Sequence, residues 1–256
     1  MASHENESTR IKSVETTLEI IDVLKQKNGA TVSELAAAIG MSKGTVHKHL
    51  ATLREHDYVV NNSGNYQVGL RFLDIGGYTL CQFDGINQIE SKLKEIADEI
   101  GETVQFSTEQ HGRSVVLAWE TGPKGVYSRA RLGKRFYMHQ TAGGKAILAN
   151  LPKQRVEAII DQHGLPPATD STITTESELF EELETISNRG YAFNKAESTD
   201  GLHAVGVPLM GPEGGVLGAF AVAGPSHGMY GNRFEDKIPN VMQSAVNEIE
   251  LNLTYS

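Results

Sequence analysis

Five side chains between positions 42 and 52 could bind the phosphates or the base edges of a nucleic acid. Two of them carry ammonium groups and three carry hydroxyls. They are Ser42, Lys43, Thr45, Lys48 and Thr52. On a helix, Leu50 and Leu53 would lie within about 40° of Val46, whereas Gly44 and Lys48 would point roughly the opposite way. The spacing therefore predicts a helix that packs on one apolar side and presents a slim polar side to a groove.

Two further helices precede this segment and would hold it in place. The first is expected to begin at Ser13, a residue type favoured as an N-cap, and to end at Asn28-Gly29. The second carries apolar residues at helical spacing, with Thr31 or Ser33 as its cap and Gly40 as its stop. The third helix then begins after a very short break. Helix, tight turn and helix at this spacing are typical of a helix-turn-helix, whose second helix lies in the major groove of DNA.

A β-hairpin is expected directly after the third helix, which Ser42 caps. Residues 58–60 and 66–68 are short β-prone runs, and the turn-rich residues 61–65 lie between them. A hairpin in this position is the wing of a winged helix-turn-helix. The wing favours DNA binding over the alternative, a small helical domain with a solvated Lys/Thr face. Thr31 joins the five side chains above as an expected DNA contact.

The remainder of the chain predicts a connecting helix and then a mixture of strands and helices. Leu70, Leu73, Gly77 and Leu80 indicate the connecting helix, and a further helix spans 86–100. Strands are expected at 104–107, 114–119, 191–196, 203–210 and 216–223. Helices are expected at 142–150, 152–163, 176–189 and 234–253. Runs of strands interrupted by helices, rather than a regular βαβ alternation, favour an α+β fold.

Composition and charge exclude several classes of protein. Of the net charge of −9, the first 70 residues contribute −1 and the other 186 contribute −8, so the acidity belongs to the C-terminal part. The one cysteine, Cys81, excludes a disulfide scaffold and a cysteine-based zinc site. No run approaches the roughly 18 apolar residues of a membrane span. We therefore expect a soluble protein of the cytoplasm with no membrane partner.

The segment TAGGKAIL, residues 141–148, invites comparison with a phosphate-binding loop. A Walker A loop would need Gly at position 139 and Ser or Thr at position 146, but His139 and Ala146 stand there. We therefore expect no ATP and no other cofactor. Two interpretations remain open: exposed amides of the loop bind an anion such as a carboxylate, or the glycines permit a tight approach of a helix to a sheet.

The chain from about Ile11 onward resembles an IclR-type transcriptional regulator. The resemblance rests on an ordered series of segments: SVETTLEIIDVL, TVSELAAAIGMSKGTVHKHLATL, YQVGLRFLDIGG, IGETVQF, LGKRFYMHQTAGGKAILANLP, ISNRGYAFNKAES, GLHAVGVPL and VAGPS. It implies a winged helix-turn-helix domain over residues 11–69, a linker helix over 70–84, and a GAF-like or profilin-like effector-binding and oligomerisation domain over 85–256. It also implies a homodimer or homotetramer on a pseudo-palindromic operator.

The same resemblance implies a pocket for a small organic effector. Its residues would be Phe136, Ala142, Gly143, Asn194, Ala204, Ala221 and Ala223. Where many relatives have an acidic residue this chain has Asn194, and where they often have one Cys and two Ser it has three alanines. Such a pocket offers fewer hydrogen bonds to a densely polar acid and more room. We therefore expect an acid that is bulkier or more apolar than a two-carbon or three-carbon keto acid.

Three other interpretations compete with a ligand-responsive regulator. Nine histidines could hold a metal, but they show no short ligand spacing, so we expect none. A hydrolase would use a serine and a histidine, yet there is no G-x-S-x-G elbow, no paired-carboxylate motif and no dinucleotide fingerprint, and we expect no enzyme. The third is a DNA-binding regulator whose C-terminal domain binds no ligand and only assembles the oligomer.

Overall fold

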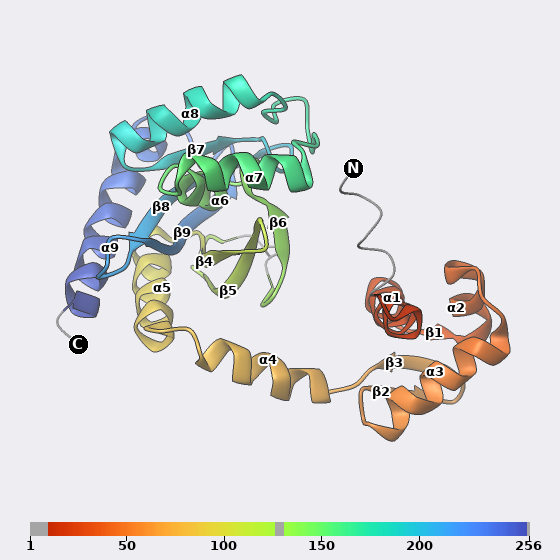
Figure 1. Cartoon of the computed structure of the whole chain (residues 1–256). Coiled ribbons are helices and arrows are strands. Elements are labelled where there is room, and N and C mark those ends of the chain that lie inside the picture. Colours follow the sequence, from red (N-terminus) through yellow and green to blue (C-terminus); the bar gives the residue numbers. More distant parts are fainter. Residues whose placement is uncertain (1–9, 126–130, 255–256) are drawn as a thin grey trace. The chain divides into compact units, whose positions relative to one another are not determined.

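The structure is a computed structural model that describes residues 10–125 and 131–254 (Figure 1). The chain divides into two compact units, the first ending at Gln82 and the second beginning at Phe83. This division falls within the segment predicted as the linker. Among the helices in the described ranges, none is both long enough and apolar enough to cross a membrane.

The first unit is a three-helix domain followed by a hairpin and one more helix. In chain order its elements are α1 Lys12–Lys27, β1 Ala30–Thr31, α2 Val32–Ile39, α3 Lys43–Glu55, β2 Val59–Asn62, β3 Asn65–Val68 and α4 Arg71–Cys81. The strands form an antiparallel sheet in the order β1-β3-β2. Its apolar core draws on all three helices and the hairpin through Ile20, Leu35, Leu50 and Tyr66, among others. This is the predicted winged helix-turn-helix.

Local sequence signals begin these helices as expected, with one exception. The Thr31 hydroxyl accepts from the Glu34 amide while the Glu34 carboxylate accepts from the Thr31 amide, a capping box that starts α2. Ser42 caps α3 by accepting from a backbone amide of the first turn. The expected cap at Ser13 is wrong, because α1 already includes that residue. Its N-cap is Ile11, whose side chain makes no capping bond.

The second unit is a six-stranded antiparallel sheet with helices on both faces. In chain order its elements are α5 Ile86–Ile100, β4 Thr103–Gln110, β5 Arg113–Thr121, β6 Arg135–Tyr137, a 3-10 turn Met138–Gln140, α6 Ala142–Leu148, α7 Lys153–His163, α8 Glu176–Arg189, β7 Ala192–Lys195, β8 Leu202–Met210, β9 Val216–Pro225, a π-helical turn Arg233–Lys237 and α9 Ile238–Thr254. The strand order is β6-β5-β4-β9-β8-β7. Helices α5 and α9 pack on each other, and α6 packs on β8 and β9 (Figure 1).

Most predicted elements of this unit are present, and the mixture of strands and helices confirms the α+β class. Three details differ. The helix expected at 142–150 ends at Leu148, and the helix expected from Phe234 begins with a π-helical turn before α9. Strand β6 was not predicted, because three residues show no periodicity and the strand forms by pairing with β5.

Candidate DNA-binding and effector sites

The outward side of α3 carries two ammonium groups. Lys43 and Lys48 are exposed, and neither forms an ion pair within the described part of the chain. Gly44 is also exposed, and a Cβ built on it would meet no atom nearer than the Ser42 hydroxyl oxygen at 3.9 Å. The backbone of the first turn is therefore open to a close approach, and the lysines are free to bind phosphates.

The hydroxyls predicted to contact DNA are already held by local hydrogen bonds. Ser42 Oγ and Thr45 Oγ1 lie 2.9 Å apart at the start of α3, whereas Thr52 Oγ1 donates to the Lys48 carbonyl at 3.2 Å. The Thr31 hydroxyl donates to the Glu34 carboxylate at 2.8 Å. The first turn of α3 thus gathers Ser42, Lys43 and Thr45, while Lys48 and Thr52 follow along the helix and Thr31 caps α2.

A contact that the sequence did not predict joins α1 to α3. The Thr17 hydroxyl oxygen lies 2.8 Å from His49 Nδ1 and also 2.8 Å from the Ser13 carbonyl oxygen. A carbonyl only accepts, so the one hydroxyl proton goes to Ser13, and His49 Nδ1–H must donate to Thr17. This bond requires a proton on His49 Nδ1 and connects α3 to α1.

Four of the predicted effector residues lie in two rows across one face of the sheet. Asn194 stands opposite Ala204, which stands opposite Ala223. In the second row, which lies two positions further along the strands, Ala221 stands opposite Gly206. Residues paired in this way point to the same face. Ala204 and Ala221 are buried and Ala223 is half-buried. These three alanines are called the alanine floor below.

The start of α6 lies directly on the alanine floor. A Cβ on Gly143 would lie 3.5 Å from the Ala221 Cβ, and a Cβ on Gly206 would lie 2.4 Å from the carbonyl carbon of Ala142. A Cβ on Gly144 would lie 2.2 Å from a backbone oxygen. Of the two interpretations of TAGGKAIL, these contacts support the tight approach of a helix to a sheet.

Two of the amides at this loop already have acceptors within the protein. All seven residues of α6 are buried. The Gly144 amide donates to the Thr141 hydroxyl at 3.0 Å, and the Lys145 amide donates to the Thr141 carbonyl at 2.9 Å. These two amides therefore have partners within the protein.

Asn194 is 1% exposed and is bonded at both ends of its side-chain amide. Its Nδ2 donates to the Gln140 carbonyl at 2.6 Å, and its Oδ1 accepts from the Glu197 amide at 3.1 Å. Asn194 therefore ties β7 to the turn that precedes α6. Phe136, in contrast, lies on β6, which β5 and β4 separate from β9, so the strand order keeps it apart from the alanine floor.

A buried ion pair beside this site was also missed by sequence reasoning. The Lys145 side chain is 2% exposed, and its Nζ lies 2.6 Å from Glu197 Oε2 and 3.3 Å from Glu182 Oε1. Arg189 pairs with the same Glu182 oxygen at 3.2 Å. The pattern of the sequence gave no signal for these contacts, because residues of α6, α8 and the turn after β7 meet only in the folded chain.

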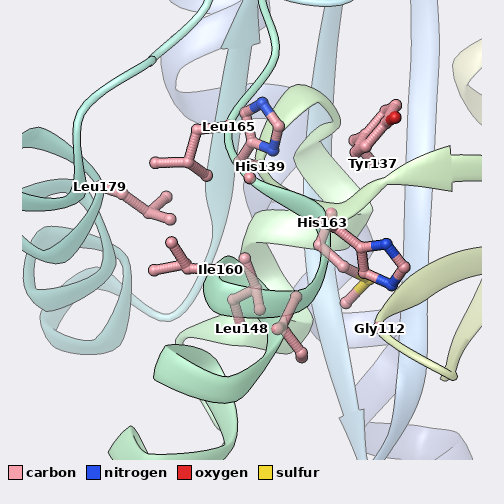
Figure 2. Close-up of a pocket in the computed structure, with 11 residues that line it drawn as sticks. Gly112, Tyr137, His139, Leu148, Ile160, His163, Leu165 and Leu179 are labelled. Carbon is pink, nitrogen blue, oxygen red and sulfur yellow. The ribbon is translucent and has the colours of Figure 1, made fainter. Parts of the chain in front are cut away.

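A small pocket lies between α7, α8 and the turn before α6 (Figure 2). Its volume is about 10 Å³, enough for about one water molecule and too little for an organic effector. His139 lines it and donates from Nε2 to the Pro166 carbonyl at 3.1 Å. Burial lowers the pKa of His139 below its ordinary value, and the charges of Arg113 and Lys145 lower it further, against the raising effect of that hydrogen bond.

A larger surface depression, of about 560 Å³, lies elsewhere in the second unit. It is lined by residues that the sequence did not single out: Glu102, Lys124, Pro225, His227, Gly228, Tyr230 and Arg233. At its base the Arg233 guanidinium donates to the Glu102 carboxylate at 3.0 Å. As for metals, the described residues contain no group of three or more His, Cys, Asp or Glu side chains that could hold an ion.

Comparisons with known proteins match both units. Residues 13–63 match the family model of the IclR helix-turn-helix domain, and residues 79–251 match that of the bacterial transcriptional regulator IclR C-terminal domain. The probable HTH-type transcriptional regulator ArcR of Halobacterium salinarum is 31% identical over 256 residues, which cover 98% of this chain and 97% of that protein.

Solved structures agree with this assignment. The crystal structure of the Thermotoga maritima IclR matches with a TM-score of 0.78 and 27% identity, over 96% of this chain and 100% of that one. An IclR homolog from Microbacterium hydrocarbonoxydans, complexed with 4-hydroxybenzoate, shares the fold with a TM-score of 0.79 and 17% identity, over 95% of this chain and 100% of that one. Since the two family models together span most of its length, this chain belongs to the IclR family of DNA-binding transcriptional regulators.

Proposed function

We propose that this regulator binds a pseudo-palindromic operator as a homodimer, or as a pair of such dimers. We further propose that its affinity for the operator changes when a small organic acid binds the second unit. The observation that carries the DNA half is the exposed first turn of α3, with Lys43 and Lys48 unpaired beside Gly44. A two-fold symmetric protein reads two half-sites that its own symmetry spaces. A regulator of this kind would act in the cytoplasm, where the chromosome lies. It would have no catalytic role.

Support for self-association comes from apolar side chains left uncovered in the first unit. Along α1, Val14 and Leu18 are 51% and 57% exposed. On α4, Leu73 and Tyr78 are 70% and 67% exposed, and none of its residues is buried. Apolar residues repeated along a helix in this way favour burial against a second copy of the chain.

Support for an effector comes from the alanine floor together with a related structure. The half-buried Ala223 gives this floor an apolar edge, which suits the body of an organic acid better than its polar groups. The Microbacterium homolog, which shares the fold, was solved with 4-hydroxybenzoate. We therefore propose a carboxylic acid larger than pyruvate as the effector.

Thermal unfolding with four acids tests the effector half. The acid panel is 4-hydroxybenzoate, benzoate, pyruvate and glyoxylate, each added to the full-length protein. A bound acid at 100 times its Kd stabilises the folded state by about 2.7 kcal/mol. We expect stabilisation by the larger acids and a changed affinity for the duplex upstream of the regulator's own gene.

Two outcomes would favour other functions. If no acid stabilises the protein or changes its DNA affinity, the effector half of the proposal fails for this class. A second unit that only assembles the oligomer would then be the better interpretation, and the deep burial of Ala204 and Ala221 under α6 favours that second candidate. Consumption of an ester substrate by the purified protein would instead favour a hydrolase.

A further inference from the structure

Two hydrogen-bond donors stand opposite each other next to the alanine floor. Gln105 on β4 pairs with Trp119 on β5, and on its other side it pairs with Ala221 on β9. Side chains that pair across strands share a face, with Cβ atoms about 5 Å apart. The Gln105 amide, the Trp119 indole and the Ala221 methyl therefore form one continuous row.

This row continues the face on which α6 lies. A Cβ on Gly143 would be 3.3 Å from Ser107 Oγ and 3.5 Å from the Ala221 Cβ, which places Ser107, Ala221 and hence Gln105 on the α6 side of the sheet. Solvent exposure increases along this row: Ala221 is 3% exposed, Gln105 is half-buried and Trp119 is 37% exposed. The row thus runs from beneath α6 toward solvent.

Three polar groups on this part of the face, those of Gln105, Trp119 and Ser107, have no hydrogen-bond partner among the described residues. Neither the Gln105 amide nor the Trp119 indole N–H makes a hydrogen bond there. Ser107, two residues further along β4 and 1% exposed, has a hydroxyl oxygen that is buried without any partner. A buried unpaired hydroxyl such as that of Ser107 costs free energy, and functional sites are where such a cost is commonly retained. The N–H groups of Gln105 and Trp119 are partly exposed and therefore accessible to a ligand.

We propose that the Gln105 Nε2 and Trp119 Nε1 groups together bind the carboxylate of the effector, while its body lies on the exposed side of the alanine floor at Ala223. This inference rests on the proposed function, because it presumes that the second unit binds an organic acid. It adds a second anion-binding element beside the first turn of α6, where the amides of Gly144 and Lys145 already donate to Thr141.

The chemistry of the two donors determines which ligands they select. A carboxylate only accepts hydrogen bonds, and an indole N–H only donates them. With the Gln105 amide oriented so that Nε2 and the Trp119 N–H both face the ligand, the two donors suit an anion, whereas a carboxamide would require that amide to turn so that its Oε1 accepts instead. The site should prefer an acid over the amide of the same acid, and it achieves this with neutral groups.

The single tryptophan of the chain makes the proposal testable, because all indole fluorescence comes from Trp119. The full-length protein is titrated with the acid panel and with 4-hydroxybenzamide, and both the emission and the thermal unfolding are recorded. The variants are Gln105→Met, which removes the amide, and Trp119→Phe, which removes the N–H and is followed by unfolding alone. Gln110→Met, at the exposed end of the same strand, is the matched control.

We expect an acid that stabilises the protein to change the Trp119 emission with the same Kd. Gln105→Met and Trp119→Phe should each raise that Kd about tenfold to a hundredfold, as the loss of a hydrogen bond to a charged group predicts, and Gln110→Met should leave it unchanged. The amide should bind at least about tenfold more weakly than the acid.

Different results overturn different statements. An acid that stabilises the protein but leaves the Trp119 emission or the Kd of Gln105→Met unchanged overturns the assignment of these donors and leaves the proposed function standing. Equal binding of acid and amide overturns the preference for an anion at this row. If no acid in the panel stabilises the protein at all, the proposed function fails for this class and the assignment fails with it.

Discussion

The two ammonium groups on α3 are expected to supply the salt-sensitive part of the affinity for DNA. Lys43→Ala and Lys48→Ala should each weaken binding to every duplex and reduce the slope of log K against log salt by about 0.9 for each phosphate that is no longer neutralised. Titrations of a duplex at several salt concentrations measure that slope. Lys237→Ala, an exposed lysine of the second unit, is the control. Unchanged slopes in both α3 variants would show that this side of the helix does not face the phosphates.

Asn194 is a structural residue in this molecule, and its replacement by a carboxylate tests that role. Asn194→Asp exchanges the donor of the 2.6 Å bond to the Gln140 carbonyl for an oxygen, which leaves two acceptors facing each other in a buried place. We expect the free energy of unfolding in urea to fall by at least about 2 kcal/mol at neutral pH. The loss should shrink at acidic pH, where the new carboxyl group is protonated. A variant as stable as the parent at both pH values would refute this role.

His139 predicts a dependence of stability on pH. Its pKa is lowered by burial, so below the ordinary histidine pKa of about 6.5 the unfolded chain binds a proton that the folded chain does not. Stability from this residue is fully present above about pH 6.5 and is lost as the pH falls toward the lowered pKa. His139→Gln keeps a donor for the Pro166 carbonyl without a titrating group. The free energy of unfolding of the parent minus that of the variant should therefore fall below about pH 6.5, and a pH-independent difference would count against it.

At the scale of elements, the sequence predicted those features that neighbouring residues determine by themselves. The capping box at Thr31 and the stop at Gly40 each depend on residues a few positions apart, so their types are sufficient to locate α2. Ser13 was a misleading signal, because a serine favoured as an N-cap also occurs within a first helical turn. The hairpin turn could also be predicted from neighbouring residues. Ser63 and Gly64 adopt the left-handed conformation that such turns need.

Features that depend on distant parts of the chain were not predictable from one sequence. The pairing of Gln105 with Trp119 and Ala221 needs the strand order, which periodicity does not determine. The Lys145–Glu197 ion pair needs α6 to lie beside the turn after β7. The resemblance to a known family supplied all three alanines of the floor, but it did not reveal that both ends of the Asn194 amide are bonded within the protein.

At the scale of the whole molecule, the uncovered residues of α4 predict an effect on assembly. Leu73→Glu places a charge on an apolar position that is 70% exposed, so it should leave the fold intact and disfavour burial of α4 in a dimer. Light scattering at micromolar concentration should find a dimer or tetramer for the parent and a smaller species for the variant. Thr79→Glu would be a poor control because it lies on the same helix, so Glu157→Gln on α7 is used instead. A parent that is monomeric without DNA would contradict the proposed assembly.

Binding of the operator and of the effector should also be coupled equally in both directions. If an acid lowers the affinity for the operator by some factor, the operator must lower the affinity for the acid by the same factor. Titration of the protein with the acid, with and without saturating operator duplex, measures this factor twice. Agreement within experimental error is expected, and a mismatch would indicate an additional binding event.

The contact between Gly206 and the backbone of Ala142 also bears on how such regulators diverge. A side chain of any size at Gly206 would collide with α6, so this position has no room to vary while the helix keeps its place. Ala223, on the same face, is only half-buried at the edge of the core that includes α6, so a change there would be restricted less than one at Gly206. Divergence within the family is therefore expected mainly at the edge of the sheet, whereas the centre of the sheet must keep glycine for α6 to stay in place.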